Sequence, residues 1–183
     1  MSYRQFAQRI RVPSGFVLLP LLFVLARPTA TMLIAGLAVA SVGLATRAWA
    51  SGYLKKNEEL TTAGPYAYTR NPLYLGTFLL GAGAALGSGS LIFVAVYLAF
   101  YLALYLPVIH AEAETMKKMF PDSYAGYSHD VPLLLPKLPR YRAASSAVKF
   151  DPSLYLKHRE YQAAIGFVVI YALLVLKWIA LAE

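Results

Sequence analysis

Gly64-Pro65-Tyr66-Ala67-Tyr68-Thr69-Arg70-Asn71-Pro72-Leu73-Tyr74-Leu75-Gly76 is the most informative stretch of this chain. It places an arginine, two prolines, three tyrosines and two glycines directly before an apolar segment. A simple turn between membrane helices needs only a proline or glycine and a polar residue. A charged, conformationally restricted segment at a helix start is typical of a site that holds an anionic or zwitterionic ligand.

The composition is that of an integral membrane protein. The 183 residues are 58% hydrophobic and 14% charged, with a mean hydropathy of +0.53, whereas soluble domains carry about 25% charged residues. This length favours a single domain. The absence of cysteine excludes disulfides, thiolate nucleophiles and cysteine metal sites. No metal site is expected from the histidines either, because His110, His129 and His158 lie in different local contexts.

Apolar segments predict an all-α, polytopic membrane bundle of about five transmembrane helices. The segments are 13–26, 29–50, 72–86, 90–109 and 161–182. Because a membrane span needs about 20 apolar residues, 13–26 and 72–86 are short. We interpret 13–26 and 29–50 as a hairpin with Pro28 in the first turn of the second helix. A re-entrant first segment is the alternative. Gly87-Ser88-Gly89-Ser90 predicts a turn.

The net charge of +8 follows membrane orientation and does not indicate a nucleic-acid partner. If the N-terminus is cytoplasmic, every lysine and arginine except Arg27 and Lys177 falls on the cytoplasmic side, which is the positive-inside pattern. Lys177 can snorkel from within the last helix. We therefore expect a protein of a bacterial inner membrane whose N-terminus is cytoplasmic, with anionic lipid headgroups as partners.

Two kinds of side chain predict helix contacts. Small residues at i,i+4 spacing allow close approach of helices in lipid. The chain has two such pairs: Gly36 with Ala40, and Gly83 with Gly87. One face of the fourth segment carries three tyrosines at i,i+4 spacing: Tyr97, Tyr101 and Tyr105. We interpret the tyrosines as packing residues and an interfacial belt; the alternative is a wall that lines a lipid or cofactor channel.

The residues between 110 and 160 form the main extramembrane part. The fourth helix is expected to continue past the lipid, break at Pro121-Asp122-Ser123 and restart. The segment 132–139 holds three prolines and is expected to be extended. Asp151-Pro152-Ser153 predicts a turn before the last helix.

Ionisable residues beside the membrane supply the available chemistry. Asn71 is expected to cap the third helix by accepting a backbone N–H, and Pro72 suits its first position. A helix N-terminus next to Arg70 fits a carboxylate, to which arginine offers a bidentate fork.

Acidic residues complement this arginine. Glu112 and Glu114 lie about 200° apart on a helix, so they do not form one paired-carboxylate site. His110 can pair with Glu114 at i,i+4, which leaves Glu112 free for a ligand ammonium.

A two-part pattern resembles the isoprenylcysteine carboxyl methyltransferase and phospholipid methyltransferase superfamily. The first part is Gly64-Pro65-Tyr66-x-x-x-Arg70-Asn71-Pro72-x-Tyr74-x-Gly76; the second is Phe120-x-x-x-Tyr124-x-x-Tyr127-x-x-x-Val131-Pro132, after an acidic helix. The resemblance covers residues 58–136. It implies an integral membrane enzyme that uses S-adenosylmethionine to methylate a lipid-borne group. The cofactor pocket would face the cytoplasm under the extramembrane segment, and the lipid substrate would enter sideways between helices.

Site residues follow from the same resemblance. It implies that Arg70 and Glu112 are the catalytic or substrate-orienting pair. The residues that it implies for cofactor binding are Gly64, Pro65, Tyr66, Asn71, Tyr74, Leu75, Glu114, Tyr124 and Tyr127. The family often has histidine at the position of Asn71, and asparagine cannot shuttle a proton. The family's adjacent acidic pair is Glu112-Ala113 here, followed by Glu114.

The single methyltransferase domain divides into four parts: an N-terminal hairpin (1–57), a catalytic core (58–136), a cytoplasmic linker (137–160) and a C-terminal transmembrane helix (161–183). Two other classes stay open. An NADPH-dependent sterol or enone reductase would need more spans and a basic site for the 2′-phosphate. A non-enzymatic scaffold would leave residues 64–76 unexplained. The acceptor, a carboxylate or a phospholipid amine, is not decided by the sequence.

Overall fold

The computed structural model describes residues 3–55, 59–141 and 149–182. In these residues the chain forms helices and no strand. The elements are α1 (Tyr3–Leu25), α2 (Ala30–Ser51), the 3-10 helix η1 (Gly64–Ala67), α3 (Pro72–Gly87), α4 (Leu91–Met119), α5 (Pro121–Asp130), α6 (Pro152–Lys157) and α7 (Tyr161–Ala182). The predicted all-α membrane bundle is confirmed. Lys56, Arg142 and the boundary predicted at residue 57 lie outside the described residues.

Three of the described helices are long and apolar enough to cross a membrane: α2, α4 and α7. The apolar part of α1 (Pro13–Leu25) and α3 are shorter, so the count of five crossings stays a prediction. α4 is longer than the predicted segment and continues to Met119 without ending at Pro107. Only 17% of the apolar window of α7 is buried in the protein, which fits a helix that faces lipid.

Some helix starts agree with the sequence patterns, and the start of α2 differs at one proline. Thr29 caps α2, where its hydroxyl accepts the Met32 N–H at 3.3 Å. Pro28 therefore precedes the helix, and its predicted place in the first turn is wrong. The predicted break at Pro121 is confirmed, because Phe120 ends α4 and precedes α5. The turn predicted at Asp151 is the capped start of the short helix α6.

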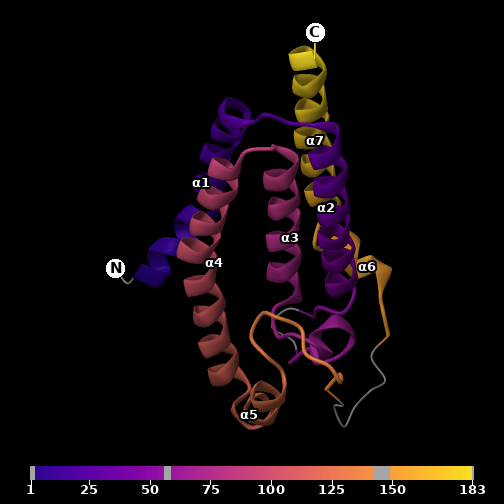
Figure 1. The fold of residues 1–183 in the computed structure, drawn as a ribbon. Helices are drawn as coiled ribbons and strands as arrows, with labels where there is room; N and C mark the ends of the chain where they lie inside the picture. The colour runs from indigo at the N-terminus through magenta and orange to yellow at the C-terminus, as the bar shows by residue number, and fades with distance from the viewer. Residues whose placement is uncertain (1–2, 56–58, 142–148, 183) are drawn as a thin grey trace.

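α3 lies between two groups of helices (Figure 1). α1 packs on α4 at one side, and α2 and α7 lie at the other. The turns that follow α1 and α3 meet at one end of the bundle, where the Arg27 N–H donates to the Ser88 carbonyl at 2.7 Å. η1, α5 and the segment directly after α5 lie at the opposite end.

Glycines bring α2 and α3 into backbone contact. A Cβ on Gly43 would lie 2.6 Å from the Leu80 nitrogen and 2.8 Å from the Gly76 carbonyl oxygen, and one on Gly83 would lie 2.5 Å from the Gly36 carbonyl oxygen. No larger residue fits these positions without separating the helices. The predicted contact of small residues between the two helices is confirmed.

Tyrosines join α3 to α4. Tyr97 donates its hydroxyl to the Phe78 carbonyl, and Tyr101 donates to the Tyr74 carbonyl, both at 2.9 Å. Tyr105 stacks on Tyr101 with ring centroids 4.8 Å apart. Buried tyrosines whose hydroxyls are hydrogen-bonded act as packing residues, which agrees with the packing interpretation. Tyr97 and Tyr101 are buried and thus do not form an exposed interfacial belt.

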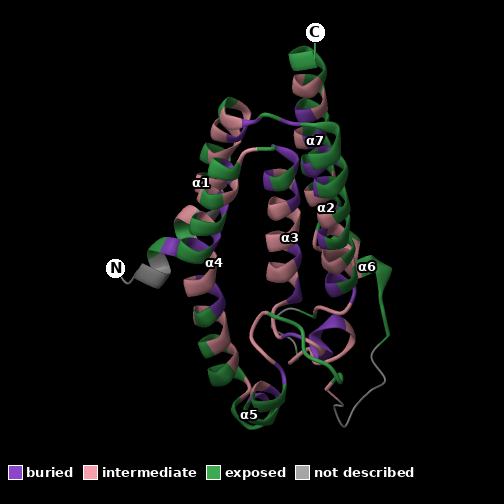
Figure 2. Cartoon of the chain, in the orientation of Figure 1, coloured by how far each residue is buried: buried purple, intermediate pink, exposed green. Residues whose placement is uncertain are grey.

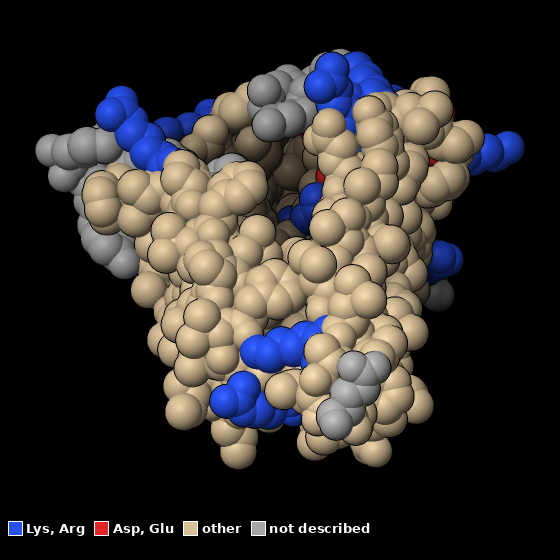
Figure 3. Space-filling model, turned by 90° about the horizontal axis from the view of Figure 1, so that it is seen from above, with Lys and Arg blue, Asp and Glu red and all other residues tan. Residues whose placement is uncertain are grey.

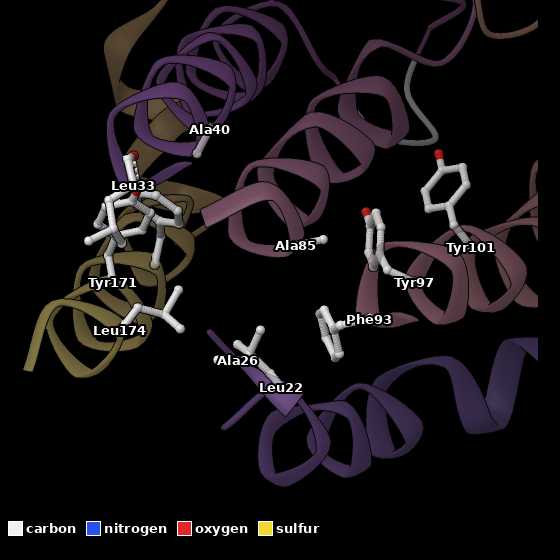
Figure 4. Packing of buried hydrophobic residues seen from close by; sticks show 11 residues of the cluster. Leu22, Ala26, Leu33, Ala40, Ala85, Phe93, Tyr97, Tyr101, Tyr171 and Leu174 are labelled. Carbon is white, nitrogen blue, oxygen red and sulfur yellow. Dashed lines mark hydrogen bonds between the residues drawn. The ribbon is translucent and has the colours of Figure 1, made fainter. Parts of the chain in front are cut away.

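The main core lies where α1, α4 and α7 approach α2 and α3. Figure 4 shows side chains from these helices gathered there, among them Leu22 of α1, Phe93 of α4 and Leu174 of α7. Exposed residues cover the outward faces of the helices (Figure 2), and many of them are large and apolar. Such a surface is suited to lipid.

Candidate functional site

The site begins with a turn that requires glycine. Gly64 has a φ of +58°, which favours glycine, and a Cβ at this position would lie 2.6 Å from the Tyr53 ring. Pro65 follows in the first turn of η1. Pro65 and Tyr66 are buried, so the predicted cofactor loop is a fixed, packed segment.

An irregular segment that contains three prolines, residues 131–141 (the strap), lies against this loop. Hydrogen bonds that join the two run from Arg70 N to Pro132 O (2.9 Å), Thr69 Oγ1 to Leu134 O (2.8 Å), Asn71 Nδ2 to Leu133 O (2.9 Å), Lys137 N to Tyr68 O (3.0 Å) and Tyr141 N to Ala67 O (2.8 Å). The segment forms no helix or strand, but it bends at residues 131, 133–135, 138 and 139, so the expectation that it is extended is not confirmed. These hydrogen bonds continue beyond residue 136, the predicted end of the catalytic core.

Asn71 has a different role from the one expected. It occupies the N-cap position of α3, but its side chain makes no capping hydrogen bond. Its amide donates to the Leu133 carbonyl instead, so it fixes the strap to the helix start. The prediction of a side-chain cap is wrong because a tertiary acceptor takes the amide. Pro72 begins α3 as predicted.

Arg70 is held by an aromatic residue of α5. Its Nη1 donates to the Tyr124 hydroxyl at 2.9 Å, and its guanidinium carbon lies 5.8 Å from the centre of that ring. The Nε atom of Arg70 is buried and has no hydrogen-bond partner among the described residues. A buried N–H without an acceptor is costly, so this nitrogen is a candidate donor for a ligand oxygen.

Glu112 is held by an aromatic residue of α3. The Tyr74 hydroxyl donates to Glu112 Oε1 at 2.5 Å. The Tyr74 backbone is in turn fixed by Tyr101 of α4, and the Tyr105 ring lies edge-on to the Tyr74 ring with centroids 6.0 Å apart. The predicted site residues Tyr74 and Glu112 are therefore in direct contact.

Arg70 and Glu112 do not form an ion pair with each other. A further hydrogen bond runs from the Tyr127 hydroxyl to the Tyr66 carbonyl at 2.8 Å. Burial, then the carboxylates of Glu160 and Glu112, raise the pKa of Tyr66 far above its usual value. Burial raises the pKa of Tyr127 as well, while Arg70 opposes the rise. Neither tyrosine can act as a base near neutral pH.

The structure does not bring every predicted residue into the site. Glu114 is exposed and has no hydrogen bond or ion pair to a described residue. His110 does not pair with it, because its Nδ1 is hydrogen-bonded to the Leu106 carbonyl at 2.8 Å. Leu75 is part-buried in α3, where its N–H donates to the Asn71 carbonyl.

A second arginine and glutamate were missed by sequence reasoning. Arg47 of α2 binds Glu160, which precedes α7, through Nε to Oε2 at 2.9 Å and Nη2 to Oε1 at 3.0 Å. Arg47 also donates to the hydroxyl of Thr77 at 2.5 Å and to the Leu73 carbonyl at 3.4 Å. An arginine inside the apolar run 29–50 was the available signal, since such a charge normally has a buried partner.

One face of the molecule has a hollow that contains charged side chains (Figure 3). Seen along the bundle in Figure 3, lysine or arginine atoms and a small area of aspartate or glutamate atoms lie within a hollow between largely uncharged walls. In the described part of the chain, no three His, Asp or Glu side chains are grouped so as to hold a metal ion.

Fold and site together define an all-helical integral membrane protein with a polar site at one end of its bundle. Its family is defined by sequence comparison: the phospholipid methyltransferase profile matches residues 30–123, and the chain belongs to this family.

Two curated proteins are similar in sequence. The cobalt-zinc-cadmium resistance protein CzcN of Cupriavidus metallidurans is 37% identical over 145 residues, which cover 74% of this chain and 66% of that protein. The nickel-cobalt-cadmium resistance protein NccN of Alcaligenes xylosoxydans xylosoxydans is 29% identical over 113 residues, or 61% of this chain and 51% of that protein. The match therefore spans less than two thirds of either relative. No solved structure matches the chain.

Proposed function

We propose that this protein transfers a methyl group from S-adenosylmethionine to a lipid-borne acceptor at the cytoplasmic face of a bacterial inner membrane. The observation that carries the proposal is the buried, unpartnered Nε of Arg70. The family match supports methyl transfer as the reaction.

The residues present fit the methyl donor. Arg70 offers a fork for the carboxylate of its amino-acid part, and the free Nε supplies a donor for one of the carboxylate oxygens. Glu112, fixed by Tyr74, carries a negative charge suited to an ammonium. Gly64, Pro65 and Tyr66 would shape the wall, while Tyr124 and Tyr127 would help to close it. When bound, S-adenosylmethionine supplies an electrophilic methyl on a sulfonium.

Positioning is the main task of the protein in such a reaction, because an in-line displacement gains most from fixed geometry. The strap holds Asn71 and Arg70 by hydrogen bonds and covers the helix start. Asn71 has no titratable proton, and burial keeps Tyr66 and Tyr127 protonated. A carboxylate acceptor needs no base. An amine acceptor must arrive unprotonated, and Glu112 is the carboxylate placed to orient it.

Binding of the donor tests the proposal. Isothermal titration of the detergent-solubilised protein with S-adenosylmethionine and with NADPH separates a methyltransferase from a reductase and from a scaffold. We expect binding of S-adenosylmethionine alone, weakened about a hundredfold by Arg70→Ala, since truncating a buried hydrogen-bonded charge costs about 2–5 kcal/mol.

Arg140→Ala is the matched control, because this strap arginine is exposed. If the donor does not bind, or if the two variants bind it equally well, the proposal is wrong.

Product chemistry identifies the acceptor class. Membranes that contain the protein are incubated with a labelled methyl donor, and the labelled lipid is treated with base. A base-labile methyl ester indicates a carboxylate acceptor, and a stable N-methyl group indicates an amine.

Names of the two relatives point to a cellular setting. Both are named as metal resistance proteins. We propose that this chain works in the same setting, with lipid methylation as its chemical contribution. Loss of metal tolerance in cells that carry the Arg70→Ala variant, compared with Arg140→Ala, would support this role.

A further inference from the structure

Arg47 of α2 lies against the part of α3 that carries Tyr74. Its Nη1 atom donates to the Leu73 carbonyl and to the Thr77 hydroxyl, and that hydroxyl donates to the same carbonyl at 2.9 Å. A Cβ on Gly76 would lie 2.5 Å from Cγ of Arg47, so the glycine leaves the room in which the arginine crosses α3. Leu73, Gly76 and Thr77 share one face of the helix. Tyr74 lies about 60° around the helix from Thr77, so Arg47 fixes the turn from which Tyr74 projects.

Glu160 holds Arg47 in this position. The Nε and Nη2 atoms of Arg47 donate to the two carboxylate oxygens at 2.9 and 3.0 Å, and the Glu160 side chain is only 9% exposed. A bidentate pair fixes the plane of the guanidinium, which leaves Nη1 directed at Leu73 and Thr77. Glu160 follows the part of the chain that the family profile matches. The C-terminal part of the chain therefore supplies a residue that orients α3.

A capped turn places Glu160. The Arg159 N–H donates to the Leu156 carbonyl at 3.0 Å, and the Glu160 N–H donates to the Tyr155 carbonyl at 3.2 Å. These two bonds form a Schellman motif at the end of α6. Arg159 has a φ of +54°, a conformation that favours glycine. A non-glycine residue keeps this conformation where the surrounding structure fixes it, and the contact that follows directly is the bond between Glu160 and Arg47.

Both arginine–glutamate couples influence one tyrosine of the candidate site. Burial is the main cause of the raised pKa of Tyr66, and the carboxylates of Glu160 and Glu112 raise this pKa further. Arg47 opposes the rise. A charge shifts the pKa of a neighbour mainly over a short range. The pair of Arg47 and Glu160 therefore borders the same polar site as Glu112.

We propose that Glu160 is a positioning residue of the methyl-transfer site. Glu160 orients Arg47, and Arg47 fixes the turn of α3 that carries Tyr74. Tyr74 in turn orients Glu112 through its hydroxyl. This inference rests on the proposed function, in which Glu112 is the carboxylate that faces an ammonium.

Fluorine NMR tests the positioning without any methyl donor. The detergent-solubilised protein is labelled with 3-fluorotyrosine, and the Tyr74 signal is assigned by its loss in Tyr74→Phe. We expect Glu160→Gln to shift this signal, because an amide has only one acceptor oxygen for the arginine. Glu59→Gln is the matched control. It removes the same charge from an exposed ion pair with Lys55, so it should leave the Tyr74 signal unchanged.

The Thr77 hydroxyl separates transmission through α3 from the loss of a charge. Thr77→Val removes an acceptor of Arg47 on α3 and keeps the bond to Glu160, so it should also shift the Tyr74 signal. Thr77→Ser retains the hydroxyl and should restore the wild-type signal. Thermal unfolding of each variant is recorded in parallel to confirm a folded sample.

Rates of labelled methyl transfer give an independent result. Glu160→Gln should lower the rate about fivefold in the wild-type background, equivalent to about 1 kcal/mol. In the Tyr74→Phe background it should leave the rate unchanged, because a residue that acts through the Tyr74 hydroxyl then has nothing to position. A merely structural role would lower both rates by the same factor.

Three results would overturn the proposal: an unshifted Tyr74 signal in Glu160→Gln, an equal shift in Glu59→Gln, or the same fold loss of rate in both backgrounds. Absence of methyl transfer by the wild type would contradict the proposed function instead. The fluorine signal would then still decide whether Glu160 positions Tyr74.

Discussion

Two arginine–glutamate couples lie beside α3, and they are built differently. Arg47 and Glu160 bind each other directly, with nitrogen–oxygen distances of 2.8–3.0 Å. Arg70 and Glu112 are each hydrogen-bonded to a tyrosine instead, at 2.9 and 2.5 Å.

The difference distinguishes an ion pair that holds helices together from charged side chains that can bind a ligand. A direct pair satisfies most of its own bonding capacity, and in this chain it links α2, α3 and the start of α7. A charged side chain that is held by a neutral tyrosine has no opposite charge bound to it, so its charge is available to a ligand. The second arrangement therefore suits a ligand with a carboxylate and an ammonium, while the first suits a structural role.

Breaking the direct pair should give the largest loss of stability. Arg47→Met leaves the carboxylate of Glu160 buried and unpaired, which costs about 3–5 kcal/mol for a fully buried pair. Since the Arg47 side chain is 21% exposed, we expect about 2–3 kcal/mol. The double variant Arg47→Met with Glu160→Leu should recover most of it, because no charge is left unpaired. Denaturant unfolding in detergent measures both.

Lys55→Met is the matched control for this prediction. Lys55 pairs with Glu59 on the surface, where both side chains are more than 40% exposed, and such pairs contribute at most about 1 kcal/mol. An equal loss in Arg47→Met and Lys55→Met would remove the distinction between a structural pair and a surface pair.

Removing a tyrosine hydroxyl from the other couple should affect activity more than stability. Tyr74→Phe leaves Glu112 without its donor, and we expect methyl transfer to fall about tenfold, equivalent to about 1.4 kcal/mol. The free energy of unfolding should change by less than about 1 kcal/mol, the typical net value of one hydrogen bond. The rate of labelled methyl transfer is compared with that of Tyr161→Phe, an exposed change. Identical rates would show that Glu112 does not depend on Tyr74.

Alkaline pH should give the smallest effect in the usual working range. The pKa values of Tyr66 and Tyr127 are raised in the folded protein, so folding favours the protonated forms. Their contribution is fully present below the ordinary tyrosine pKa of about 10 and is lost as the pH rises above it. We expect a flat stability curve up to about pH 10, then a decline of up to about 1.4 kcal/mol per pH unit for each group.

Thermal unfolding between pH 7 and 11 measures this decline. Tyr127→Phe removes one of the two groups and should make the curve less steep above pH 10. A decline that begins near pH 8, or one that is unchanged in Tyr127→Phe, would contradict the assignment to these tyrosines.

Local patterns predicted the helices well. The apolar segments 29–50, 72–86 and 161–182 correspond to α2, α3 and α7 within two residues at each end, because hydrophobicity and turn residues determine where membrane helices begin and end. The contact of Gly36 with Gly83 was also predictable, since small residues at i,i+4 have few other reasons to occur in lipid.

Tertiary hydrogen bonds were not predictable in the same way. Tyr74 and Glu112 are 38 residues apart, and Arg47 and Glu160 are 113 apart, so no spacing rule relates them. Asn71 had a sufficient local role as a cap, and only the approach of the strap shows that its amide is used elsewhere. The resemblance to methyltransferases indicated which residues matter without indicating which of them touch.

The two faces of α3 have a consequence for its freedom of movement. Its glycine face sets the distance to α2 at backbone contact, so the helix cannot move closer. Its other face presents the carbonyls of Tyr74 and Phe78 to hydroxyls of α4, so the helix cannot slide or turn without breaking these bonds. A rotation by one residue, about 100°, would carry Tyr74 away from Glu112. α3 therefore has one angular setting, and that setting is the one in which the tyrosine reaches the carboxylate.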